Sequence, residues 1–242
     1  MSFGWEYALS RRWSKIQRIY IRLIGVVDLP TRMRARVVLS ATAGLTGETI
    51  VDFGAGTGVY SYFYSRQLDR EVTAVDVDND RIYEINKIAG ELGRDRLIAV
   101  AGDERYFTAS KRGEVELVVA IEVLQYCRRL EELLRDIRVS LRPGGALVAH
   151  VPVRQYLEPY EQHLFTDEFL LELMHRAGFE TAKVERTFGP TAQRLCAVFQ
   201  LLSRRPVLLA VLFPLLLLGA SLTPCVSKTG ASRLLVAYKA RD

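Results

Sequence analysis

The sequence predicts an α/β fold in which a doubly wound, mostly parallel sheet is covered by helices on both faces. Three observations lead to this prediction. Short apolar runs alternate with stretches of helical period from residue 49 to about residue 189. Most of these runs are apolar throughout, as is typical of strands that are buried on both faces. A glycine-rich turn follows the first run, at the point where open α/β sheets bind their ligands.

The alternation gives a definite order of elements. Strands are expected at residues 49–53, 71–76, 96–101, 115–121, 145–151, 181–188 and 233–239. Helices are expected at residues 58–68, 79–92, 129–141 and 166–177, with a short helix after the third strand. Parallel strands connected in this way have their carboxyl ends at one edge of the sheet, and ligands bind there.

The remaining segments lie at the N-terminus and before the last strand. We expect a helical arm over residues 1–46, a core made of residues 47–189 and 231–242, and an apolar helical insert over residues 190–230. A chain of 242 residues is long enough for one α/β core with such additions.

The N-terminal arm carries the whole net charge of +5. Residues 1–50 contain eight basic and three acidic side chains, and the charges of the other residues cancel. Residues 5–24 are expected to form one amphipathic helix with an apolar face and a basic face. Such a helix either packs on the core or lies in a membrane interface, and the sequence leaves both open. A second helix is expected from Asp28 and Pro30 to about Thr42.

The insert contains a nearly charge-free run between Pro206 and Pro224. About twenty apolar residues are needed to span a bilayer, and Pro214 interrupts this shorter run. Because the run lies between two strands of one sheet, both of its ends must return to the same side of a membrane. We therefore expect a monotopic or re-entrant hairpin in contact with a membrane, flanked by Arg204 and Arg205. The alternative is a dimer interface or a lid over an apolar pocket.

The most informative motif is the glycine turn in Val51-Asp52-Phe53-Gly54-Ala55-Gly56-Thr57-Gly58. A strand, a tight turn and a helix start allow backbone N–H groups to face a ligand. The spacing is G-x-G-x-G behind an acid, whereas a dinucleotide site requires G-x-G-x-x-G. The turn resembles motif I of class I S-adenosylmethionine-dependent methyltransferases. In that family the turn meets the amino-acid end of the cofactor, which implies contacts from Asp52, Gly54, Ala55, Gly56 and Gly58.

Two further segments extend the resemblance along the cofactor. Asp76 ends the second expected strand and is placed, with Val77 beside it, to accept hydrogen bonds from both ribose hydroxyls. Asp78 is a weaker alternative, and both acids could instead cap the following helix. The segment Gly102-Asp103-Glu104 resembles the part of the family that faces the adenine. The resemblance implies that Asp103 accepts from the exocyclic amine, with help from the backbone of Glu104.

Two more segments match the second half of the family's core. The segment Ile121-Glu122-Val123-Leu124-Gln125-Tyr126 is similar to motif IV of small-molecule methyltransferases. It implies that Ile121 and Glu122 line the cofactor and that Tyr126, where many relatives have histidine, lies at the transfer site. The segment Leu141-Arg142-Pro143-Gly144-Gly145 matches a structural turn into the fifth strand. The resemblance implies a Rossmann-like, seven-stranded sheet whose last strand enters antiparallel between the fifth and sixth.

The acceptor side of the site is less well specified. Methyl transfer is an in-line displacement, so positioning in a dry pocket can supply most of the catalysis. A base is needed only if the acceptor must lose a proton, and histidine suits this task near neutral pH. His150 and His175 are expected to be structural, whereas His163 lies in the loop after the fifth strand.

The loop after the fifth strand therefore supplies most of the expected acceptor contacts. His163 is expected either to touch the acceptor or to cap the helix that follows, and Tyr156 and Tyr160 would line the same pocket. The candidate catalytic residues are His163, Tyr126 and Glu122.

The sequence as a whole predicts an enzyme that transfers a methyl group from S-adenosylmethionine, leaving S-adenosylhomocysteine. The expected acceptor is a lipidic or membrane-associated small molecule: a phospholipid headgroup, an isoprenoid quinone or a lipid-linked sugar. One alternative is a soluble O- or N-methyltransferase whose insert is a lid or a dimer interface. The other is a cofactor-binding scaffold without turnover.

The expected partners and location follow from the same features. Nucleic acid is not expected, because the chain lacks an N-P-P-Y motif and an apolar insert does not suit a phosphate surface. A homo-oligomer is compatible with the sequence. No metal site is expected from Cys127, Cys196 and Cys225, which are widely spaced. The chain starts without a signal peptide, so we expect a cytoplasmic location at the inner face of the cytoplasmic membrane.

Overall fold

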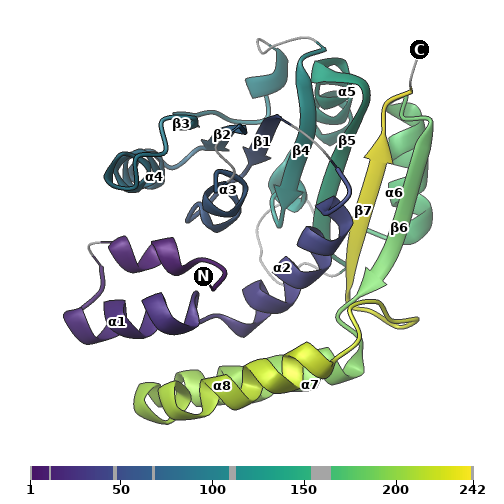
Figure 1. Ribbon diagram of the computed structural model, residues 1–242. Helices are drawn as coiled ribbons and strands as arrows, with labels where there is room; N and C mark the ends of the chain where they lie inside the picture. Colours follow the sequence, from purple (N-terminus) through teal and green to yellow (C-terminus); the bar gives the residue numbers. More distant parts are fainter. Residues whose placement is uncertain are drawn as a thin grey trace.

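The computed structural model describes residues 2–10, 12–45, 48–66, 69–108, 113–153 and 165–240. These residues contain one seven-stranded sheet with the strand order β3-β2-β1-β4-β5-β7-β6 (Figure 1). The strands are β1 (Thr49–Phe53), β2 (Glu71–Asp76), β3 (Leu97–Ala101), β4 (Val115–Ile121), β5 (Leu141–Pro152), β6 (Thr181–Thr187) and β7 (Ser232–Tyr238). The first five strands are parallel, and β7 is antiparallel to both β5 and β6. The predicted fold is confirmed, including the place of the last strand.

Helices surround this sheet in the described part of the chain. The α-helices are α1 (Lys15–Ile24), α2 (Leu29–Thr42), α3 (Val59–Tyr64), α4 (Asn79–Glu91), α5 (Leu130–Ser140), α6 (Asp167–Arg176), α7 (Pro190–Ser203) and α8 (Pro206–Leu222). Short 3-10 helices are η1 (Trp5–Leu9), η2 (Tyr106–Thr108) and η3 (Leu124–Tyr126). None of the helices described combines the length and the apolar character that a bilayer crossing requires.

Strand β4 shows how the sheet divides the core into two layers. Val118 and Ala120 belong to the apolar cluster that includes α5 and α6. Leu117 and Val119 belong to the cluster that includes α2, α3 and α4. Successive side chains of a strand point to opposite faces, so an apolar strand is buried on both sides. This is the reason why most of the strands are largely apolar.

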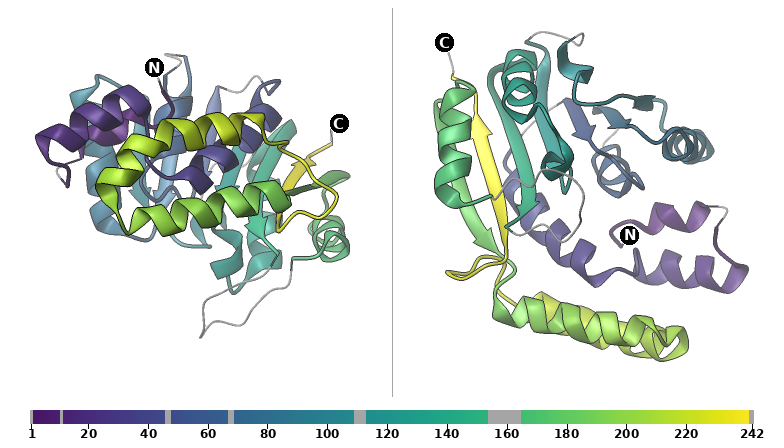
Figure 2. Two further views of the ribbon diagram at one scale, coloured as in Figure 1. Left: turned by 90° about the horizontal axis from the view of Figure 1, so that it is seen from below. Right: turned by 180° about the vertical axis from the view of Figure 1, so that it is seen from behind.

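The insert forms a helical hairpin at one end of the molecule. Helices α7 and α8 run antiparallel below α2 (Figure 2). Leu29 and Met33 of α2 share an apolar cluster with Phe199 and Phe213, whose ring centroids are 6.1 Å apart. Arg36 of α2 also donates to the carbonyl oxygens of residues 220 and 223. The hairpin is therefore fixed to the core through α2.

Helix α8 continues through Pro214, so our expectation that this proline interrupts the run was wrong. A proline inside a helix has no N–H and leaves the carbonyl four residues earlier without its usual donor. That carbonyl belongs to Ala210, and the Tyr20 hydroxyl of α1 donates to it at 2.6 Å. Phe213 and Leu216, on either side of the proline, are buried in the cluster with α2. Packing and an external donor together keep the helix continuous.

The N-terminal segment is also more divided than expected, because residues 5–24 do not form one helix. Helix η1 ends at Leu9, and α1 begins after Ser14. Ser14 and Gln17 form a reciprocal capping box, in which each side chain accepts from the other residue's backbone N–H. Such a box starts a new helix. The apolar residues keep a helical period across this capping box, so the periodicity did not reveal the break.

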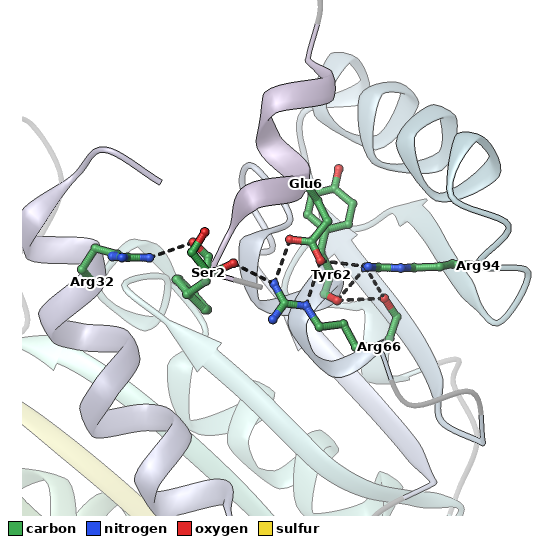
Figure 3. A network of polar contacts seen from close by, with 8 residues as sticks. Ser2, Glu6, Arg32, Tyr62, Arg66 and Arg94 are labelled. Atoms are coloured by element: carbon green, nitrogen blue, oxygen red, sulfur yellow. Dashed lines mark hydrogen bonds and ion pairs between the residues drawn. The ribbon is translucent and has the colours of Figure 1, made fainter. Parts of the chain in front are cut away.

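A buried carboxylate attaches the first ten residues to the core (Figure 3). Glu6 accepts from Arg66 Nε and Nη2 at 2.9 and 3.1 Å and from Arg94 Nη2 at 2.9 Å. Arg94 also donates to the Tyr62 carbonyl at 2.7 Å. Burial by itself would raise the pKa of Glu6, but the hydrogen bonds from Arg66 and Arg94 lower it below its ordinary value. The division into arm, core and insert stays a prediction.

We predict that Glu6→Gln destabilises the protein by about 3 kcal/mol at pH 7, because two partly buried guanidinium groups lose their counter-charge. The folded pKa of Glu6 is depressed, so its stabilisation is present above the unfolded pKa and is lost as pH falls through the folded one. The two proteins should therefore converge at acid pH. Urea denaturation at pH 7 and pH 3.5 measures the free energy of unfolding of the wild type and of the variant. Glu91→Gln, which breaks a half-exposed pair with Lys87, is the matched control and should change little.

Candidate active site

The glycine turn joins β1 to α3 at the carboxyl edge of the sheet. Gly54, Gly56 and Gly58 have φ angles of 73°, 57° and 75°, in the left-handed region that favours glycine. A Cβ on Gly54 would lie 2.5 Å from the Cβ of Val123, and one on Gly58 would lie 2.8 Å from Ile85. The turn is therefore packed against the loop after β4 and against α4, without room for side chains.

The backbone N–H groups of this turn are used inside the protein. Gly54 and Ala55 both donate to the Val75 carbonyl, at 2.8 and 3.0 Å. Gly56 donates to Asp76 Oδ2 at 2.7 Å, and Gly58 donates to the Ala55 carbonyl at 2.9 Å. The end of β2 lies beside the turn and supplies acceptors for three of these N–H groups, and the contact of the turn with the cofactor stays a prediction. The shape of the turn is consequently fixed by β2 before any ligand binds.

The two acids after β2 have different roles. Asp78 is the N-cap of α4 and accepts from the N–H groups of Asp80 and Arg81. Asp76 is almost fully buried and accepts from Gly56 and from the Asp78 N–H at 2.7 and 3.0 Å. An ionised carboxylate has about four acceptor positions, so Asp76 retains capacity for further donors. The capping alternative thus applies to Asp78.

Other predicted cofactor residues also lie at this edge. Val77 follows β2 and is 72% exposed. Asp103 follows β3, is exposed and accepts from the Arg105 N–H at 2.9 Å. Glu104 accepts from the Arg129 N–H at 3.1 Å. The carboxyl ends of the parallel strands thus bring Val77, Asp103 and Glu104 to the same edge as the glycine turn.

Asp52 lies inside the protein beneath the turn. It accepts from the Ser61 hydroxyl at 2.5 Å and is almost completely buried. Burial raises its pKa to about 6, although the hydrogen bonds from Ser61 oppose the rise. The neighbouring Tyr60 hydroxyl is also buried and has no hydrogen-bond partner among the described residues. Tyr60 was not predicted from the sequence, in which it stands out only as one of several aromatic residues after the turn.

Glu122 is the centre of a polar network directly after β4. Its φ angle is 56°, and its backbone N–H donates to the His150 carbonyl at 2.8 Å. Its Oε1 lies 2.7 Å from His150 Nδ1 and 3.4 Å from Arg34 Nε. His150 Nε2 lies 3.0 Å from the Thr187 hydroxyl. The network therefore joins β4, β5, β6 and α2.

The charge states in this network follow from burial and pairing. Burial would raise the pKa of Glu122, but the hydrogen bond to His150 and the charge of Arg34 lower it below its ordinary value. Burial lowers the pKa of His150, and Glu122 only partly opposes this. At neutral pH an ionised Glu122 accepts from Nδ1–H, and the free Nε2 of the neutral ring accepts from the Thr187 hydroxyl.

The structure assigns places to the other residues of interest. Ile121 ends β4 and is paired with His150 of β5. His150 was expected to be structural, and it is buried but also holds Glu122 directly. Tyr126 lies in η3 and is 49% exposed. His175 lies in the last turn of α6. The predicted acceptor residues Tyr156, Tyr160 and His163 lie outside the described residues.

Arg34 is the site residue that sequence reasoning missed most clearly. It comes from α2, in the segment that we assigned to the arm, and no spacing relates it to Glu122. Its only signal was its place among the basic residues of the N-terminus. For metals, no group of three or more His, Cys, Asp or Glu side chains in the described ranges could hold an ion.

Comparison with known proteins identifies the family. The family described as "Methyltransferase domain" matches residues 27–184. The chain belongs to this methyltransferase family. It is 24% identical over 148 residues to a ubiquinone biosynthesis O-methyltransferase of Cupriavidus pinatubonensis, covering 60% of this chain and 57% of the relative. It is 29% identical over 177 residues to the human thiol S-methyltransferase TMT1A, covering 65% and 70%. The chain thus spans little more than half the length of the first relative.

A solved structure shows the same fold. The phosphoethanolamine N-methyltransferase 2 of Haemonchus contortus, in complex with S-adenosyl-L-methionine, matches with a TM-score of 0.64. The identity is 15%, and the match covers 87% of this chain and 52% of that protein. The domain is a class I methyltransferase domain, and its cofactor is S-adenosylmethionine.

The residues present suit this cofactor. Asp76 retains acceptor capacity for ribose hydroxyls. Glu122 supplies negative charge for a molecule that carries ammonium and sulfonium groups. The buried hydroxyl of Tyr60, which has no hydrogen-bond partner among the described residues, is a further donor and acceptor near Asp52 and Glu122. The individual contacts stay predictions.

We predict that Gly54→Ala lowers both stability and cofactor affinity. A left-handed backbone costs a non-glycine residue about 1–3 kcal/mol, and the new Cβ would overlap Val123. Urea denaturation and calorimetric titration with S-adenosylhomocysteine measure the two effects. Gly90→Ala is the control, since a Cβ there meets nothing within 4 Å. It should leave affinity unchanged and stabilise α4 by up to about 1 kcal/mol.

We predict that Asp52→Asn stabilises the protein in a pH-dependent manner. The folded pKa of Asp52 is raised to about 6, so its favourable contribution is present below the unfolded pKa and is lost as pH rises through about 6. Asparagine cannot ionise and still offers an oxygen to Ser61. The gain should reach up to about 3 kcal/mol at pH 8 and disappear near pH 4. Urea denaturation across this range measures it, and an equal gain at both ends would contradict burial of the charge as the cause.

Proposed function

We propose that the protein transfers a methyl group from S-adenosylmethionine to a hydrophobic small molecule held in or at a membrane. The observation that carries the proposal is the position of the apolar hairpin next to the candidate site. Helix α2 packs on α7 and α8 through Leu29 and Met33, and the same helix sends Arg34 to Glu122. One helix thus connects an apolar surface to the polar centre of the site.

A groove between α2 and α8 supports an apolar acceptor. Its volume is about 370 Å³, and it is lined by Phe3, Arg32, Met33, Ala35, Arg36, Leu39, Leu217, Ala220 and Ser221. Met33 and Ala35 stand on either side of Arg34 in the chain. The guanidinium groups of Arg32 and Arg36 donate hydrogen bonds to backbone carbonyl oxygens, so these two basic side chains at the groove already have polar partners. Such a mainly apolar space suits a hydrophobic ligand.

The relatives favour a small acceptor. One is named as an O-methyltransferase of ubiquinone biosynthesis and the other as a thiol S-methyltransferase. For this chain we propose a phospholipid headgroup, an isoprenoid quinone or a lipid-linked sugar as the acceptor class, and a location at the cytoplasmic face of a membrane.

The chain's own residues have separate tasks in this reaction. When bound, the cofactor supplies an electrophilic methyl group, which passes to a nucleophile in line with the breaking carbon–sulfur bond. Glu122 is ionised and is a weak base because its pKa is lowered, so its task is to bind positive charge. His150 has both ring nitrogens engaged and is a positioning residue for Glu122. If the acceptor must lose a proton, His163 is the proposed base.

The proposal predicts that label from methyl-labelled S-adenosylmethionine enters the organic phase when the protein is incubated with a bacterial lipid extract. Glu122→Gln keeps an acceptor for His150 but removes the charge, and it should lower kcat/KM by about tenfold or more. The assay is scintillation counting after organic extraction. Label found only in water-soluble acceptors would favour the soluble alternative. Cofactor binding without any transfer would favour the scaffold.

A further inference from the structure

Helix α8 presents an unusual apolar stripe to solvent. Val207, Val211, Leu215, Leu218 and Leu222 recur at steps of three and four residues and are 58–79% exposed. Residues at this spacing share one face of a helix. The opposite face is buried on the hairpin cluster through Leu209, Phe213, Leu216 and Ala220. The helix is thus apolar on both faces, and only one of them is covered.

Helix α1 extends this stripe. Ile16, Ile19 and Leu23 follow the same spacing and are 61–81% exposed. Tyr20 lies on the same side of α1, and its hydroxyl reaches the carbonyl of Ala210 in α8. That contact places the Tyr20 side of α1 toward α8. In Figures 1 and 2 the ribbon of α1 lies near that of α8. The two stripes therefore belong to one surface, which we call the α1–α8 face.

The α1–α8 face needs a cover. Eight large aliphatic side chains, each more than half exposed, lie on two adjacent helices. Scattered exposed apolar residues are normal, whereas a contiguous patch of this kind marks an interaction surface. Helix α8 is also too short to cross a bilayer as a straight span.

The charged residues around the α1–α8 face indicate which kind of partner covers it. Residues 12–27 and 190–227 contain no aspartate or glutamate. Lys15 and Arg22 are exposed on α1, and Arg204 and Arg205 are exposed at the turn between α7 and α8. A second copy of the chain would bring like charges together around the apolar contact. An anionic phospholipid surface offers both an apolar interior and complementary headgroups.

We propose that the α1–α8 face docks on the surface of an anionic phospholipid bilayer without crossing it. Its apolar stripes enter the boundary between headgroups and acyl chains, and its basic side chains meet the headgroups. The inference builds on the proposed function, because docking would bring the groove between α2 and α8 to the membrane that holds the acceptor. Vesicle binding is measured without turnover, so the two proposals can fail separately.

The test is flotation of the full chain with two kinds of vesicle, phosphatidylcholine alone and an equal mixture with phosphatidylglycerol. The protein should float with the mixed vesicles at low salt and much less with phosphatidylcholine alone. Leu215→Glu and Ile19→Glu should each weaken binding by tenfold or more. Leu171→Glu, on an exposed apolar position of α6, is the matched control and should bind like the wild type.

Further measurements make each outcome decisive. Replacing Arg204 and Arg205 together by glutamine should reduce the preference for anionic vesicles. Titration with S-adenosylhomocysteine should give wild-type affinity for every variant, because none of these residues belongs to the cofactor site. No flotation with either vesicle would overturn the proposal. A dimer in size-exclusion chromatography that Leu215→Glu dissociates, without flotation, would assign the face to a second copy instead.

Discussion

The ion pair and hydrogen bonds of Glu122 hold together the parts of this protein on which its function depends. The carboxylate follows β4, accepts from His150 of β5 and pairs with Arg34 of α2. Helix α2 in turn carries the apolar hairpin. A partly buried carboxylate needs such partners, because its desolvation must be offset by charge and hydrogen bonds. The ion pair with Arg34 also joins α2, and through α2 the hairpin, to the edge where the strands end.

The acidic groups of the site differ in pKa because their surroundings differ. Asp52 is almost completely buried and has a raised pKa of about 6, whereas Glu122 is paired with Arg34 and His150 and has a lowered pKa. His150, buried between Glu122 and Thr187, is held neutral. The result at neutral pH is a fixed negative charge at Glu122 within a preformed edge, which suits a cationic cofactor. The shape of the glycine turn is fixed by β2, which accepts hydrogen bonds from the N–H groups of Gly54, Ala55 and Gly56.

Pro214 of the hairpin affects a contact that lies at the proposed membrane-binding surface. Pro214 leaves the Ala210 carbonyl without its helical donor, and Tyr20 supplies a replacement from α1. This hydrogen bond joins the two helices whose apolar stripes form the α1–α8 face. The proposed acceptor class and the proposed docking surface thus have a common structural origin in the packing of α1, α2 and α8.

The family resemblance implied the antiparallel last strand between β5 and β6. The sequence by itself determined the succession of strands and helices along the chain, the glycine turn and the position of Asp76. These depend on apolar periodicity, glycine spacing and the rule that parallel strands end at one edge, all of which are local or topological. Tertiary structure alone decided that Arg34 and His150 hold Glu122 and that α8 passes through Pro214. It also decided that the Tyr60 hydroxyl is buried with no hydrogen-bond partner in the described part of the chain. Contacts between distant segments have no signature in the spacing of residues. They arise when packing brings a charge or a carbonyl beside a group that can satisfy it.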